Sequence, residues 1–132
     1  MRAQLHLKNP DCLFIAGAAD PKIPFGGNEL LGPGAFIKVI EEANQCKAKI
    51  FGKPGAELGE LLLRTFDIKQ PERVLMIGDS ISSDIDFGKS IGFQTMLVLT
   101  GGTKIQDLDN TMKVNKKPDY LLVKLADLNN LI

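Results

Sequence analysis

The apolar run Val74–Ile77, which leads directly into Gly78 and Asp79, constrains the fold more than any other part of the sequence. Four consecutive apolar residues before a glycine predict a strand buried on both faces of a parallel sheet. We expect a helix from about Asp84 and a second buried strand over Thr95–Leu99. This order of strand, helix and strand predicts an α/β layered fold with a mainly parallel sheet and right-handed crossovers.

The same alternation extends along the chain. The helix expected from Pro33 has Phe36, Val39, Ile40 and Ala43 at the spacing of one buried stripe. Further strands are expected at Cys12–Ala16, Lys49–Gly52 and Tyr120–Val123, and further helices after Pro54, at Ile105–Leu108 and at Ala126–Leu131.

Between the first expected strand and the first helix lies a stretch rich in turn-forming residues. Residues 20–33 include three prolines and three glycines. This composition favours turns and a meandering loop over any regular element.

Charge and composition argue against several classes of protein. The 16 basic and 16 acidic side chains cancel, so the chain has no basic footprint for nucleic acid. No apolar stretch approaches the roughly 20 residues of a membrane-spanning helix, so we expect no membrane partner. Cys12 and Cys46 form no C-x-x-C pair, which suits a reducing compartment and predicts a cytoplasmic protein.

Two acids follow the strand at 74–77, in the pattern G-D-x-x-x-x-D formed by Gly78, Asp79 and Asp84. Mg²⁺ favours sites made of one or two carboxylates, several waters and a substrate phosphate, so the pair suits this ion. The alternative is structural, with Asp79 as a turn residue and Asp84 as an acid of the first helical turn.

A lysine occupies the corresponding place after another expected strand, in Phe51-Gly52-Lys53-Pro54. Its amine could bind phosphate as a point charge, or Lys53 could be an ordinary solvated loop residue. The lysine motif and the acid motif together are more specific than either alone.

Other catalytic chemistries find little support in the sequence. His6 is the only histidine and lies outside any periodic element, so a Ser-His or Cys-His pair would depend on one terminal residue. The sequence contains no Walker A motif, no G-x-G-x-x-G and no zinc-finger spacing.

Taken in order, the segments CLFIAG, LGPGAFIKVIEEA, IFGKPGAELGELLL, PERVLMIGDSISSDIDFGKSIGFQTMLVLTGG and KPDYLLVKLADL closely resemble the C-terminal part of haloacid dehalogenase (HAD) phosphatases. Within them, the branch of 4-nitrophenyl-, phosphoglycolate and pyridoxal phosphatases is the most similar. The resemblance implies a HAD-like three-layer α/β fold without its first core strands. Residues 1–48 would be the remnant of a C2-type cap, and residues 49–132 the second half of the core.

The resemblance also implies roles for particular residues. Lys53 would stabilise the nucleophilic aspartate and the transferring phosphoryl group. Asp79 would bind Mg²⁺ directly, and Asp84 would bind it directly or through water. Asp20, in the cap-like segment, would contact a small phosphorylated metabolite, although relatives tend to have Asn rather than Ala19 before this acid.

The departures of the sequence from the family bear on activity. The family's nucleophile lies in a D-x-D motif, and no such motif precedes Cys12. The resemblance therefore implies a chain that is inactive alone. It also implies that Val74–Ile77 is an apolar sheet edge, which favours a homodimer or association with a missing half.

Two other functions remain alternatives at this point. One is a non-catalytic binding or interaction protein derived from the HAD fold. The other is a receiver-like signalling domain, which also gathers acids and a lysine around Mg²⁺. The receiver is disfavoured because Lys53 precedes Asp79, whereas a receiver has its acid pair first.

Overall fold

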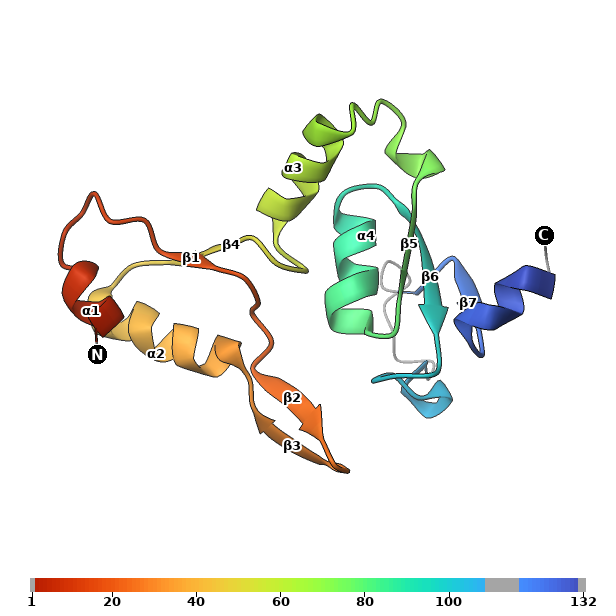
Figure 1. The fold of residues 1–132 in the computed structure, drawn as a ribbon, viewed down its shortest axis with the longest axis horizontal. Coiled ribbons are helices and arrows are strands. Elements are labelled where there is room, and N and C mark those ends of the chain that lie inside the picture. The colour runs from red at the N-terminus through yellow and green to blue at the C-terminus, as the bar shows by residue number, and fades with distance from the viewer. Residues whose placement is uncertain (1, 109–116, 131–132) are drawn as a thin grey trace. The chain divides into compact units, whose positions relative to one another are not determined.

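The computed structural model describes residues 2–108 and 117–130 (Figure 1). The chain divides into two compact units, one up to Leu58 and the other from Gly59 onward.

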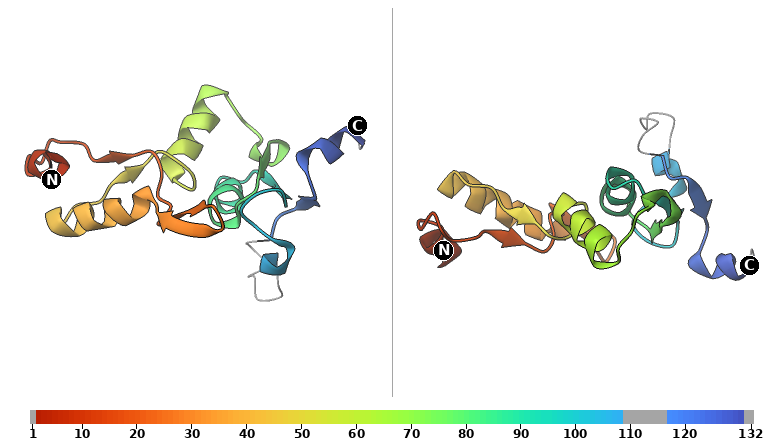
Figure 2. Two further views of the ribbon diagram at one scale, coloured as in Figure 1. Left: turned by 60° about the horizontal axis from the view of Figure 1, so that its bottom comes forward. Right: turned by 90° about the horizontal axis from the view of Figure 1, so that it is seen from above.

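The first unit contains a parallel strand pair, a hairpin and two helices (Figures 1 and 2). Its elements are α1 (Arg2–His6), β1 (Ile15–Ala16), β2 (Lys22–Phe25), β3 (Asn28–Leu31), α2 (Pro33–Asn44) and β4 (Lys49–Ile50), followed by the start of α3 (Ala56–Thr65). β1 pairs in parallel with β4. The expected strands at 12–16 and 49–52 are therefore present, in shorter form.

The prediction of an irregular loop at residues 20–33 is wrong. β2 and β3 form an antiparallel hairpin in which Lys22 lies opposite Leu31 and Phe25 lies opposite Asn28. Gly26 and Gly27 make the turn with φ angles of 55° and 82°, a backbone region that glycine adopts without steric cost. The two glycines therefore form the tight turn of a hairpin rather than part of an irregular loop.

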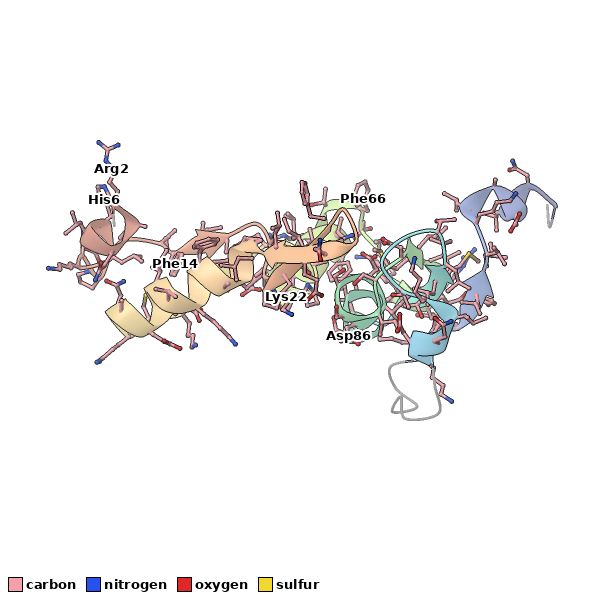
Figure 3. All side chains as sticks on the ribbon, turned by 90° about the horizontal axis from the view of Figure 1, so that it is seen from below. Arg2, His6, Phe14, Lys22, Phe66 and Asp86 are labelled. Carbon is pink, nitrogen blue, oxygen red and sulfur yellow. The ribbon has the colours of Figure 1, made fainter. Side chains whose placement is uncertain are left out.

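Helix α2 begins at Pro33, as expected, because proline is compatible with the first helical position. The expected burial of its apolar stripe is wrong. Phe36 is 60% exposed and Val39 65% exposed. α2 lies against α1 and β2, and among the described residues these contacts leave the stripe open. Helix α1, which ends at His6 (Figure 3), also contradicts the expectation that His6 lies outside any regular element.

The second unit is built around a three-stranded parallel sheet in the order β5-β6-β7. Its elements are the rest of α3, a 3₁₀ turn at Pro71–Arg73, β5 (Leu75–Gly78), a π-helical turn at Ile81–Ile85, α4 (Asp86–Ser90), β6 (Gln94–Val98), a 3₁₀ turn at Ile105–Leu108, β7 (Tyr120–Leu122) and a 3₁₀ helix at Leu125–Asn130. The expected α/β organisation with a parallel sheet is confirmed here.

The core of this unit lies on β6 rather than on β5. Thr95, Met96, Leu97 and Val98 of β6 are all buried. β5 forms one edge of the described sheet, and Leu75 is 38% exposed. Burial of the 74–77 strand on both faces is thus wrong, whereas its position at an edge is confirmed.

Helix α4 packs closely on the sheet because Gly88 faces it. A Cβ at Gly88 would lie 2.6 Å from Thr95 Cγ2 and 3.0 Å from Met76 Cβ. The helix expected from Asp84 starts slightly earlier, as the π-helical turn at 81–85, and continues into α4.

A polar cluster of Thr95, Asp119 and Lys89 links β6 to the residue that precedes β7. The Thr95 amide and hydroxyl both donate to Asp119 Oδ2, at 2.8 and 2.9 Å. On the other carboxylate oxygen, Lys89 Nζ of α4 approaches Asp119 Oδ1 to 2.5 Å. This ammonium and the Thr95 donors lower the pKa of Asp119. The closing helix expected at 126–131 appears as the 3₁₀ helix, while Leu131 lies outside the described residues.

Candidate functional site

The two predicted metal ligands lie in one loop after β5. The strand ends at Gly78, Asp79 follows at once, and Asp84 lies within the π-helical turn. Ser80 caps this turn, since its hydroxyl accepts a hydrogen bond from the Ser83 amide at 3.3 Å. The Ser80 carbonyl accepts hydrogen bonds from the amides of Asp84 and Ile85 at 2.9 and 3.1 Å. The second of these bonds spans five residues, which is the spacing of a π-helix.

Asp84 folds back onto the start of its own loop. It is only 3% exposed, and its Oδ2 accepts hydrogen bonds from the amides of Asp79 and Ser80, both at 3.0 Å. Gly78 makes room for it, because a Cβ there would lie 2.2 Å from the Asp84 carboxyl carbon. The carboxylate thus fixes the conformation of the loop that carries Asp79.

Asp79 is held from the other side by the loop that follows β6. Its Oδ2 accepts a hydrogen bond from the Gly102 amide at 2.6 Å, and its carbonyl accepts from the Thr103 amide at 3.0 Å. A Cβ at Gly101 would lie 1.9 Å from Asp79 Oδ2. The hydrogen bond between Gly102 and Asp79 joins residues 23 positions apart, so no local sequence pattern indicates it.

Lys53 lies in the first unit, after β4. The Phe51 amide donates to the Ala16 carbonyl at 2.8 Å, and the Gly55 amide donates to the Gly52 carbonyl at 2.7 Å, which turns the chain at Lys53. The lysine side chain is exposed. Its predicted position, just after a parallel strand and before a helix, is the one observed.

Asp20 follows β1, the parallel partner of β4, so both residues lie after the carboxyl ends of their strands. The Asp20 carbonyl accepts a hydrogen bond from the Gly34 amide at 2.9 Å, at the start of α2, and Asp20 is half-buried. The structure brings Asp79 and Asp84 together in the second unit, whereas Asp20 and Lys53 belong to the first.

The loop of residues 79–84, the acid loop, has donor groups that suit a magnesium ion. Two carboxylates provide the hard oxygen ligands that Mg²⁺ prefers, and this ion commonly completes its shell with water and a substrate phosphate. In the described parts of the chain, no group of three or more His, Cys, Asp and Glu residues forms a metal cluster. A site here would therefore be an open one, with few protein ligands.

Comparison with known proteins identifies the family. A model of HAD-hydrolase-like proteins matches residues 50–128, which is more than half of the chain. The chain belongs to this family. The span includes the lysine motif and the acid loop of this HAD-like chain, and the parallel sheet agrees with the fold that the sequence predicted.

Curated relatives include a named phosphatase. Glycerol-3-phosphate phosphatase from Gallus gallus is 33% identical over 129 residues, covering 92% of this chain and 41% of the relative. Chronophin from Homo sapiens is 33% identical over 127 residues, covering 93% of this chain and 43% of that protein. The HAD-like chain therefore spans about two fifths of the length of these relatives.

Solved structures give the same fold. A 4-nitrophenylphosphatase from Thermotoga maritima matches with a TM-score of 0.79 at 28% identity, covering 98% of this chain and 48% of that chain. A glycerol phosphate phosphatase from Mycobacterium tuberculosis, in complex with magnesium, matches with a TM-score of 0.75 at 25% identity, covering 96% of this chain and 37% of that one. No helix among the described residues is long and apolar enough to cross a bilayer.

Proposed function

We propose that this chain supplies the metal loop and the lysine of a HAD-type phosphatase that hydrolyses small phosphate monoesters. The observation that carries the proposal is the acid loop, in which Asp84 clamps the backbone and Gly102 holds the carboxylate of Asp79. Residues 1–48 are assigned to a cap remnant and residues 49–132 to the core. The named phosphatase relatives support the substrate class.

In this proposal Asp79 and Asp84 hold Mg²⁺, and Asp20 contacts the substrate from the cap side. The ion, when bound, offsets the negative charge of the phosphoryl group during transfer. Asp84 acts mainly by keeping the Asp79 loop in one conformation, because its Oδ2 already accepts two backbone hydrogen bonds. Lys53 supplies a positive charge to the phosphoryl oxygens and to the nucleophile.

The nucleophile would have to come from outside this sequence. HAD phosphatases form an aspartyl-phosphate on a D-x-D motif, and no such motif precedes Cys12 here. We therefore propose that the chain alone does not turn over substrate. The same observation favours the second candidate function, a non-catalytic binding protein with the HAD fold.

The edge strand suggests how a complete site would assemble. β5 has β6 on one side, and its other side is an edge of the described sheet at which Leu75 is partly exposed. An unpaired apolar edge favours pairing with another strand. We propose that the chain forms a homodimer or binds a polypeptide that carries the D-x-D motif. A stable monomer in light scattering, unchanged by that polypeptide, would contradict this association.

The test measures Mg²⁺-dependent hydrolysis of 4-nitrophenyl phosphate by two proteins. The first is this chain alone, which we expect to be inactive. The second is a chimera that places the half of the Thermotoga maritima enzyme not covered by this chain ahead of it, which we expect to be active. Asp79→Asn and Lys53→Met should each lower the activity of the chimera by about a hundredfold or more, whereas Asp67→Asn, on an exposed turn, should not.

Three outcomes separate the candidates. Activity of the chain alone that is lost in Asp79→Asn would show that another group serves as nucleophile. An inactive chimera that folds and still binds Mg²⁺ at Asp79, measured by calorimetry, would favour the binding protein. An active chimera that is indifferent to both substitutions would overturn the assigned residues.

A further inference from the structure

Both cysteines of the chain line one pocket in the first unit. The pocket has a volume of about 210 Å³, and its walls include the apolar residues Leu7, Pro10 and Leu13 together with Cys12 and Cys46. Both are free cysteines, and both are half-buried. They come from segments 34 positions apart in the sequence, so their meeting in one pocket is a product of the fold.

The strand register brings these two segments to the same level. In the parallel pair β1–β4, Ile15 lies opposite Lys49 and Ala16 lies opposite Ile50. One residue earlier, the Lys49 amide still donates to the Phe14 carbonyl at 2.8 Å. Cys12 lies three residues before Ile15 and Cys46 three residues before Lys49, so each cysteine approaches the strand pair at the same distance along its segment.

The strand pair that both cysteines precede has a spacing compatible with a disulfide. Paired strands lie about 4.7–4.9 Å apart, and a disulfide joins Cα atoms about 4.4–6.8 Å apart. Turns hold each cysteine in place, since the Cys12 amide donates to the Asn9 carbonyl at 3.0 Å and the Cys46 amide donates to the Glu41 carbonyl at 3.2 Å.

We propose that Cys12 and Cys46 form a reversible disulfide by exchange with a low-molecular-weight disulfide such as oxidised glutathione. The thiolate of one cysteine attacks a glutathione sulfur, which breaks the glutathione S–S bond and releases one glutathione thiolate. The second cysteine attacks the cysteine sulfur of the mixed disulfide and releases the second glutathione. The two cysteines are oxidised, oxidised glutathione is reduced, and the cysteine protons pass to the two released thiolates.

This bond would fasten a large part of the first unit. It closes the loop from residue 12 to residue 46, which contains the hairpin β2–β3 and helix α2. A cross-link of this length restricts the unfolded chain and stabilises the folded one. By linkage, the fold favours the disulfide by the same factor as the disulfide favours the fold.

The test uses the whole chain in glutathione redox buffers, in native conditions and in concentrated urea. We expect the native chain to lose two hydrogens in intact-mass measurement, and a cross-linked peptide containing Cys12 and Cys46 to appear after digestion without reductant. The equilibrium constant for disulfide formation should be at least about tenfold larger in native buffer than in urea. The melting temperature should rise on oxidation.

Single-cysteine variants provide the matched control. Cys12→Ser and Cys46→Ser should instead gain one glutathione each and show no rise in melting temperature on oxidation. The proposal is overturned if the oxidised wild-type chain carries two glutathiones or forms only intermolecular dimers. It is overturned equally if the equilibrium constants in native buffer and in urea are the same.

Discussion

Replacing Asp119 tests how the sheet of the second unit is held together. Thr95 is fully buried, and both of its donors end on one carboxylate oxygen of Asp119. A hydrogen bond to a charged acceptor contributes about 1.5–3 kcal/mol when it is buried. Because 38% of the Asp119 side chain is exposed, water replaces part of the lost interaction. We therefore expect Asp119→Ala to lower the free energy of unfolding by about 2 kcal/mol.

Two further variants separate the contributions to this cluster. Asp119→Asn retains an acceptor oxygen for Thr95 but loses the charge, so it should cost about 1 kcal/mol. Lys89→Ala removes only a partly exposed ion pair and should cost about 0.5 kcal/mol. Urea unfolding followed by circular dichroism measures all three. If Asp119→Ala costs no more than Lys89→Ala, then the Thr95 contacts do not stabilise the sheet.

The same carboxylate makes stability depend on pH. Lys89 and the Thr95 donors hold the pKa of Asp119 below its ordinary value of 3.8 in the folded chain. The unfolded chain then takes up this proton at higher pH than the folded chain does. The contribution is therefore fully present above the ordinary carboxyl range and is lost as the pH falls through the lowered pKa. Asp119→Asn should flatten the acid limb of the stability profile.

Three glycine substitutions test the loop that holds Asp79 and the turn of the hairpin. Gly101→Ala should weaken Mg²⁺ binding by about tenfold, because its Cβ would lie 1.9 Å from the Asp79 carboxylate. The matched control is Gly102→Ala, which keeps its amide and places a Cβ at an ordinary 3.5 Å from Asp79 Oδ2. Calorimetry should find a Mg²⁺ affinity close to wild type for this control. If both variants bind Mg²⁺ with equal affinity, the role of Gly101 is refuted. Gly27→Ala should destabilise the hairpin by about 1 kcal/mol through backbone strain alone, since its φ is 82° and nothing lies within 4 Å of the new Cβ. Faster amide exchange in β2 and β3 is the expected sign, and unchanged exchange would refute it.

The sequence predicted the strands and helices whose signal is local. The run at 74–77 became β5, Pro33 began α2, and the acid motif formed one loop after β5. Helical and strand periods report which residues prefer which backbone conformation, and these preferences were correct for the segments just named.

The hairpin escaped prediction because its strands have no buried face. All eight residues of β2 and β3 are exposed, so hydrophobic alternation carries no signal there. The paired glycines at the turn were the available signal, since adjacent residues with positive φ suit a tight hairpin. In this segment the turn and the backbone pairing, rather than burial, specify the structure.

Burial and tertiary contacts were the other source of error. Whether an apolar run is buried depends on what lies beside it, and β5 lies at an edge whereas β6 lies between two strands. The contact between Gly102 and Asp79 likewise joins the loops after two neighbouring strands. Neither fact can be obtained from the residues of one segment, because both depend on strand order.

The way Asp84 folds back has a consequence for which ions the loop accepts. Amides at the start of a helical turn ordinarily attract phosphate and other anions. Here the amides of Asp79 and Ser80 are already bonded to a carboxylate of the same loop. An incoming anion would have to displace Asp84 and face the charge of Asp79. The loop therefore repels a phosphate that arrives without a cation, because its amides are occupied and its carboxylates are negative.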